Sequence, residues 1–111
     1  MLIRPFKFKA WDQENNLMVR LNQIECKKGL LIKQNHILLQ FTGFLDQAET
    51  ELYENDIVLK GQHKYMICWD PEEGSWYWQS MAGNKERLPT KNFNLNEVVK
   101  LCNYYETTEL S

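Results

Sequence analysis

Three carboxylates lie close together in the short stretch ELYENDIV, and side chains of this kind serve as general acids and bases in enzymes. Such chemistry also needs a partner acid, base or metal beside the reactive group, and no such constellation surrounds Glu51, Glu54 or Asp56. Asp56 instead follows Asn55, a residue that tolerates turns, and precedes the strand-forming run Ile57–Val58. We therefore predict that Asp56 accepts hydrogen bonds from backbone N–H groups at a turn and does not face a cleft.

Further residues that could bind a metal or act as nucleophiles are widely spaced in the chain: Cys26, His36, His63, Cys68 and Cys102. Structural zinc sites usually draw on close pairs such as Cys-x2-Cys, and the sequence has none. A nucleophilic cysteine–histidine pair would need a third residue to orient it, and no such residue stands out. A glycine-rich phosphate loop is also missing. We therefore expect no metal, no cofactor and no enzymatic activity.

The composition is typical of a globular protein with one domain, or with one domain and a small appendage. Of the 111 residues, 43% are apolar and 13% are aromatic. The cysteines are few and far apart, so we expect free, reduced thiols as in cytoplasmic proteins. The N-terminus lacks the apolar core of a secretory signal, and no stretch is long and apolar enough to span a bilayer. These features predict a cytoplasmic protein without membrane contact.

Charge is distributed unevenly along the chain, although the net charge is only −2. This balance argues against a general nucleic-acid binder, because such proteins are usually strongly basic. Residues 1–33 hold seven Lys and Arg against three acids, a balance of +4, whereas residues 34–111 hold six against twelve, a balance of −6. Two interpretations are open. The two parts have ordinary solvated surfaces, or they complement each other electrostatically within one chain or between copies.

Alternating apolar and polar residues predict a mainly β fold. The runs FKFKAW and LMVRL flank the polar cluster DQENN, which indicates an N-terminal β-hairpin. Later alternation predicts strands over 36–43, 56–61, 64–70, 75–80 and 97–105, with a loop or hairpin over 44–56 and a loop over 81–92. Short strands at roughly ten-residue spacing are typical of a small barrel or sandwich. The side chains expected to line the interior are Phe6, Phe8, Ile37, Leu39, Phe41, Ile57, Val58, Ile67, Val99 and Leu101.

Aromatic and basic side chains mark two candidate interaction surfaces. In SWYWQS, Trp76 and Trp78 share one strand face, and Tyr77 lies on the other. The simplest interpretation is a core face with a cross-strand pair, and the alternative is an exposed platform for a partner protein or for stacked bases. In FKFKAW, basic side chains interleaved with an aromatic suit contact with phosphates and bases. The candidate interaction surface therefore comprises Lys7, Lys9, Trp11, Trp76, Tyr77 and Trp78.

Three blocks of the sequence resemble the YopX family in order and spacing. They are KFKAWDQENNLM at 7–18, LLQFTGFLDQAETELYENDIV at 38–58 and LCNYYETTEL at 101–110, and the central block is the most specific. The family's glycine before Asp-Ile-Val is Asn55 here, and asparagine tolerates the left-handed backbone that glycine would adopt. The family's Asn-Gly-Lys turn in the central loop is replaced by QAET.

The resemblance implies a mainly β fold with an SH3-like barrel. We expect the N-terminal β-hairpin element to occupy residues 1–33 and the SH3-like β-barrel domain to occupy residues 34–111. The family consists of small proteins encoded by bacteriophages, prophages and mobile elements, without an established biochemical activity. The resemblance therefore implies a cytoplasmic protein of a bacterial host and assigns no catalytic residue.

Two functional hypotheses follow from these observations. The first is a non-enzymatic accessory protein of a phage, prophage or mobile element that acts through protein–protein contacts. Its partner would be a host or phage protein, or a second copy of the chain in a homo-oligomer. The second hypothesis is a nucleic-acid-binding small-barrel module that uses the basic N-terminal hairpin, and this hypothesis depends on fold analogy.

Overall fold

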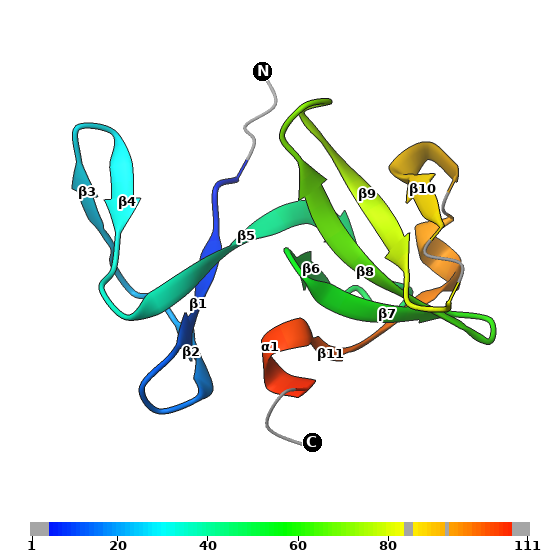
Figure 1. Cartoon of the computed structure of the whole chain (residues 1–111), viewed down its shortest axis with the longest axis horizontal. Coiled ribbons are helices and arrows are strands. Elements are labelled where there is room, and N and C mark those ends of the chain that lie inside the picture. Colours follow the sequence, from blue (N-terminus) through cyan, green and yellow to red (C-terminus); the bar gives the residue numbers. More distant parts are fainter. Residues whose placement is uncertain (1–4, 84–85, 93, 108–111) are drawn as a thin grey trace.

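The computed structural model describes residues 5–83, 86–92 and 94–107, and most of these residues lie in antiparallel β-strands (Figure 1). The predicted mainly β fold is confirmed, and curled sheets form the small barrel-like unit that the resemblance implied. No helix within the described ranges is long and apolar enough to cross a membrane.

The first sheet joins the N-terminal hairpin to the centre of the molecule. Its strand order is β2-β1-β5-β6, with β1 (Phe8–Asp12), β2 (Leu17–Arg20), β5 (His36–Leu45) and β6 (Glu51–Tyr53). A separate two-stranded sheet is formed by β3 (Glu25–Lys27) and β4 (Leu30–Ile32). The β3–β4 hairpin therefore pairs with no other strand of the described chain.

The second large sheet contains most of the hydrophobic core. Its strand order is β10-β9-β8-β7-β11, with β7 (Asp56–Lys60), β8 (His63–Asp70), β9 (Ser75–Ser80), β10 (Arg87–Pro89) and β11 (Val98–Asn103). Short helical turns complete the fold: η1 (Thr90–Asn92), η2 (Leu95–Glu97) and α1 (Tyr104–Thr107). The stretch 81–92, which we expected to be a loop, thus contains β10, and its pairing with β9 extends the edge of the sheet.

The predicted N-terminal hairpin is present, and Asp12 shapes its turn. The Asp12 Oδ1 atom accepts hydrogen bonds from the backbone N–H groups of Glu14 at 3.0 Å and Asn15 at 3.2 Å. Asn16 closes the turn with a left-handed φ of 53°, a conformation that asparagine adopts readily. The local sequence DQENN therefore accounts for this hairpin.

The long strand β5 connects the N-terminal hairpin to the rest of the β fold. Its first half pairs with β1, and its second half pairs with β6 after a register shift. We expected this strand to end at Gly43, but it continues to Leu45 because Gly43 adopts a φ of 90° that lets the strand bend without stopping. The division into residues 1–33 and 34–111 stays a prediction.

A buried cluster of apolar side chains forms the core: Leu52, Val58, Ile67, Trp76, Trp78 and Val98. The expected interior positions of Leu39, Phe41, Ile57, Val58 and Ile67 are confirmed, since each is at most 7% exposed. Phe8, Ile37 and Val99 are partly buried.

Two expected interior residues lie in solvent. Phe6 is 67% exposed, because it precedes β1 beyond the point where β2 ends. Leu101 is 44% exposed, because a register shift between Lys100 and Cys102 leaves it without a partner on β7. This bulge changes the alternation along β11, and Val98 occupies the interior at the start of the strand.

The predicted free thiols are confirmed for all three cysteines, Cys26, Cys68 and Cys102. Cys68 lies within β8, where burial raises the pKa of its thiol. This environment favours the protonated thiol, which is the less reactive form of cysteine.

Asp46 fastens the β5–β6 turn to strand β11. Its Oδ1 atom accepts hydrogen bonds from the backbone N–H groups of Ala48 at 2.8 Å and Thr50 at 2.9 Å, and its Oδ2 atom accepts one from Lys100 N–H at 2.9 Å. Burial by itself raises the pKa of Asp46, but these N–H donors outweigh it, so the pKa is lowered. The hairpin that replaces the family's Asn-Gly-Lys turn is thus held by one carboxylate.

Replacing Asp46 with alanine should lower the free energy of unfolding by about 1–3 kcal/mol, because three partly buried hydrogen bonds from backbone N–H groups lose their common acceptor. The pKa of Asp46 is lower in the folded state, so its stabilising contribution is present above about pH 4 and is lost as the pH falls below that value. Urea unfolding of the wild type and of Asp46→Ala as a function of pH should show a gap that narrows in acid.

The matched control is Asp70→Ala, which removes a similar acceptor from the partly exposed β8–β9 turn. Water can replace that acceptor, so the control should lose less stability. An Asp46→Ala protein as stable as the wild type at neutral pH would contradict this role for Asp46.

Candidate functional site

Two adjoining cavities lie between the N-terminal hairpin and the barrel-like sheet. The larger has a volume of about 530 Å³ and is bounded by the start of β1, the segment 21–24 and β6. The smaller, of about 240 Å³, is bounded by β1, β2, β7 and β11. Lys9, Arg20 and Tyr53 line both cavities, so the two adjoin along these side chains as parts of one site. We call it the basic cleft, after Lys7, Lys9, Arg20 and Lys100 in its walls.

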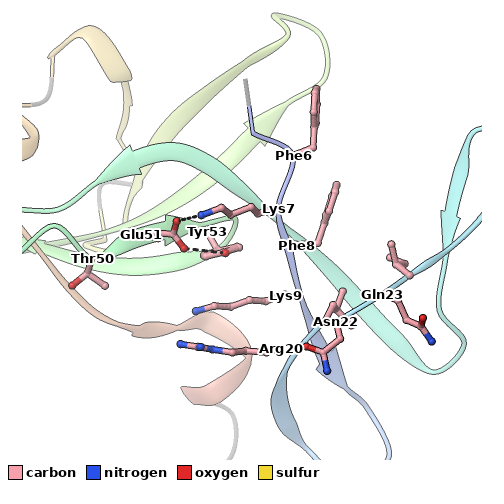
Figure 2. A pocket seen from close by; sticks show the side chains of 12 residues that line it. Phe6, Lys7, Phe8, Lys9, Arg20, Asn22, Gln23, Thr50, Glu51 and Tyr53 are labelled. Carbon is pink, nitrogen blue, oxygen red and sulfur yellow. Dashed lines mark hydrogen bonds and ion pairs between the residues drawn. The ribbon is translucent and has the colours of Figure 1, made fainter. Parts of the chain in front are cut away.

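Strand pairing places the cations of the basic cleft on one face. Lys9 and Arg20 are directly opposite in the β1–β2 pair, so their side chains project to the same side of the sheet. Lys7 lies two residues before Lys9 and shares its orientation, and Figure 2 shows all three side chains extending to the same side, where Lys7 reaches Glu51. Lys100 comes from β11 and reaches the smaller cavity from the opposite wall.

Two of these cations have carboxylate partners. Lys7 forms an ion pair with Glu51 at the larger cavity, and Figure 2 marks this contact. The Lys7 ammonium group is the first cause of the lowered pKa of Glu51. Lys100 Nζ lies 3.4 Å from Asp56 Oδ2 at the smaller cavity. These pairs leave Lys7 and Lys100 with only part of their charge available to a ligand.

Lys9 and Arg20 form no ion pair with the described residues. The Lys9 ammonium group lies 4.5 Å from the ring centroid of Tyr53, a cation–π contact. Burial lowers the pKa of Lys9, and the charges of Lys100 and Arg20 lower it further against the opposing influence of Asp56. The guanidinium group of Arg20 makes no hydrogen bond to a residue of the described chain. The middle of the basic cleft therefore carries two positive charges that no ion pair with the described residues neutralises.

Asp56 holds the structural role that the sequence predicted. It is 1% exposed, its Oδ2 atom accepts from the backbone N–H of Tyr53 at 2.7 Å, and its Oδ1 atom accepts from Asn103 Nδ2 at 3.0 Å. Asn55 adopts the expected left-handed backbone, with a φ of 65°. One part of the prediction was wrong, because Asp56 also lines the smaller cavity. Burial raises the pKa of Asp56, and its hydrogen bonds oppose that shift.

The aromatic residues of the candidate interaction surface lie mostly inside the protein. Trp76 is 8% exposed and Trp78 is fully buried in the core, which corrects the alternative of an exposed platform on that face. Trp11 is 6% exposed and stacks on Tyr105, with ring centroids 6.1 Å apart. Tyr77 is partly buried beneath the guanidinium group of Arg87. The structure thus brings Lys7 and Lys9 together at the cleft but not with these aromatics.

Sequence reasoning missed Arg20 and Lys100 as members of the cleft. Arg20 had a usable signal, since a four-residue turn between the first two strands places it opposite Lys9. Lys100 is more than ninety residues from Lys9 in the sequence, and no local pattern connects them. In the described ranges, no group of three or more His, Cys, Asp and Glu side chains is arranged to hold a metal.

The β3–β4 hairpin, which we call the arm, is a second exposed feature. It projects away from the other strands in Figure 1. Lys28 and Gly29 form its two-residue turn with φ values of 52° and 82°, the left-handed conformation that tight hairpins require. Leu30 is 67% exposed and Ile32 is 38% exposed. The arm thus presents apolar side chains without cover from the described chain.

Comparisons with known proteins agree with the fold. The family model described as YopX protein matches residues 23–110. The crystal structure of protein EF1440 from Enterococcus faecalis is similar, with a TM-score of 0.62 and 19% sequence identity. The match covers 96% of this chain and 97% of that chain, and at this identity it shows a shared fold. No curated protein matches the sequence.

Asp56→Ala should lower the free energy of unfolding by about 1–3 kcal/mol, since Tyr53 N–H and the Asn103 amide lose a buried acceptor. Asp56→Asn keeps one acceptor oxygen and should lose less. The neighbouring Glu54→Ala is a suitable control, because the Glu54 side chain accepts only one long hydrogen bond, of 3.4 Å from Gln40 N–H, within the described chain. Thermal melts of the four proteins would test the ranking, and an unchanged melt for Asp56→Ala would refute the structural role.

Proposed function

The chain belongs to the YopX family, and on this premise we propose that it is a non-enzymatic accessory protein of a phage, a prophage or another mobile element. It acts in the cytoplasm of a bacterial host through protein–protein contacts, and its partner is a second copy of the same chain. The observation that carries this proposal is the exposed arm formed by β3 and β4.

An isolated two-stranded hairpin is at best marginally stable in water, so the arm gains from packing against another surface. Leu30 and Ile32 project from the same face of β4, and both are exposed. Complete burial of a side chain of this kind, relative to full exposure, contributes about 1.5–3 kcal/mol to the free energy of association. Two of them therefore form an apolar contact that favours association.

Charge complementarity supports a second copy as the partner. The arm carries Lys27 and Lys28 near its turn, and one ion pair, between Lys27 and Glu25, lies within it. The β8–β9 turn carries Asp70, Glu72 and Glu73, and the adjacent Trp69 is 40% exposed. In Figure 1 the arm and this turn are well apart, so a single chain does not bring them together. A basic, apolar arm of one copy suits the acidic, aromatic turn of another.

The hydrogen bonds of Asp56 support the non-enzymatic part of the proposal. Both of its oxygen atoms already accept hydrogen bonds from the protein, so this carboxylate serves the fold and is not held ready for acid–base chemistry. The second hypothesis, a nucleic-acid module that uses Lys7, Lys9 and Trp11, has weaker support. Trp11 lies beneath Tyr105, and Lys7 is paired with Glu51. Trp11 is therefore not available for stacking on a base.

Sedimentation velocity should show that the wild-type protein associates, and that the association weakens with added salt. The double variant Leu30→Ser, Ile32→Ser should weaken it at least about tenfold, because the apolar contact is lost. Leu17→Ser is the matched control, since Leu17 is 48% exposed on β2 outside the arm, and it should associate like the wild type.

A charge exchange tests the choice of partner surface. Lys28→Glu should weaken the association, and adding Glu73→Lys to the same chain should restore part of it, because the opposite charges again meet between copies. A wild type that stays monomeric at the highest concentration that remains in solution would refute self-association. An association that Leu30→Ser, Ile32→Ser leaves intact would refute the role of the arm.

A further inference from the structure

Three cationic side chains from distant parts of the sequence meet in the smaller cavity of the basic cleft. Lys9 comes from β1, Arg20 from β2 and Lys100 from β11. Like charges that approach one another in a partly desolvated space disfavour their charged forms unless an anion compensates them. The cluster therefore indicates a site that is completed by an anion.

The acidic groups of the same cavity do not neutralise this cluster. The carboxylates in its wall are Asp56 and Glu106, so three cations face two acids and the balance is +1. Both oxygen atoms of Asp56 are engaged by the protein, and Glu106 Oε1 accepts from the backbone N–H of Asn103 at 2.9 Å. Arg20 keeps its N–H donors directed to no described residue. The cavity therefore has both spare charge and spare donors.

We propose that the basic cleft binds a phosphate group, with Arg20, Lys9 and Lys100 as its ligands. A guanidinium group donates two parallel hydrogen bonds to phosphate oxygens, and the two ammonium groups add point charges. A phosphate monoester carries nearly two negative charges and three acceptor oxygens, so one group can engage all three side chains. A carboxylate carries one charge and would leave part of the cluster uncompensated.

The larger cavity provides room for the organic part of the ligand. Its volume of about 530 Å³ falls within the range of about 300–1,000 Å³ that is usual for small-molecule sites. In Figure 2, Phe6 and Phe8 lie on the side of β1 away from the lysines, and Phe8 is the one nearer to Asn22 and Gln23. Phe8 can pack against a planar ring of the ligand, and the amides of Asn22 and Gln23 can bind the polar edge of that ring. A free mononucleotide and a segment of single-stranded nucleic acid both present a phosphate with such a ring.

Calorimetric titration of the full chain at low salt would test the proposal, with inorganic phosphate, adenosine 5′-monophosphate and a short oligothymidylate as probes. We expect binding of at least one probe, and Arg20→Gln should weaken it about tenfold or more, because a bidentate charged contact is lost. Arg20 is exposed and makes no hydrogen bond within the described chain, so this variant should fold normally. Bound phosphate should also raise the pKa of the Lys9 ammonium group, measured by NMR, which a purely structural role would not do.

Lys91→Gln is the matched control, since it removes an exposed cation on η1 outside the cleft and should keep the wild-type affinity. Tighter binding of the oligothymidylate with a steep salt dependence would identify nucleic acid as the source of the phosphate. Equal or tighter binding of the mononucleotide would identify a free ligand, and either result supports the site. No binding of any probe by the wild type, or an equal loss in Lys91→Gln, would overturn it. The double variant Leu30→Ser, Ile32→Ser should bind the probes like the wild type. A failure of the self-association proposal can therefore be distinguished from a failure of the phosphate site.

Discussion

The buried carboxylate of Asp56 lies at the start of β7, which pairs with β11, and it links β11 to β6, a strand that pairs with neither β7 nor β11. A buried charge is costly unless hydrogen bonds and opposite charges compensate it, and here the backbone of Tyr53, the Asn103 amide and the Lys100 ammonium group do so. The Asn103 amide also donates to the carbonyl of Glu54, so the end of β11 is fastened to the turn before β7. The Lys100 side chain belongs both to this network and to the wall of the basic cleft, so the network links the stability of the fold to the geometry of the site.

Local patterns in the sequence were sufficient to predict most strands and turns. The alternation in FKFKAW and the polar cluster DQENN specify the first hairpin, because both the strand period and the turn residues are local properties. The same holds for Asn55, whose left-handed backbone follows from its place before a strand. The phase of β11 could not be predicted, because the bulge at Leu101 depends on pairing with β7, which is distant in the sequence.

The candidate site was less predictable than the fold, for a related reason. Large aromatic residues such as Trp76 and Trp78 stood out in the sequence as candidate surface residues. Burying such large apolar side chains gives a large gain in stability, so both lie in the hydrophobic core. Lys9 was identified from its strand, whereas its partners in the cleft come from β2 and β11. A site assembled from three strands through tertiary packing leaves no spacing signal, and only a correct prediction of register would have added Arg20.

The arm and the basic cleft share a physical property that separates them from the rest of the molecule. Elsewhere, exposed turns satisfy their own polar groups, as Asp12 and Asp70 do for the backbone that follows them. In the arm, Leu30 and Ile32 are apolar without cover, and in the cleft, Arg20 is charged without a partner among the described residues. Neither state stabilises an isolated chain, and each is relieved by a different kind of contact, an apolar surface for the arm and an anion for the cleft. The two sites can therefore be occupied independently, since none of the residues that define one belongs to the other.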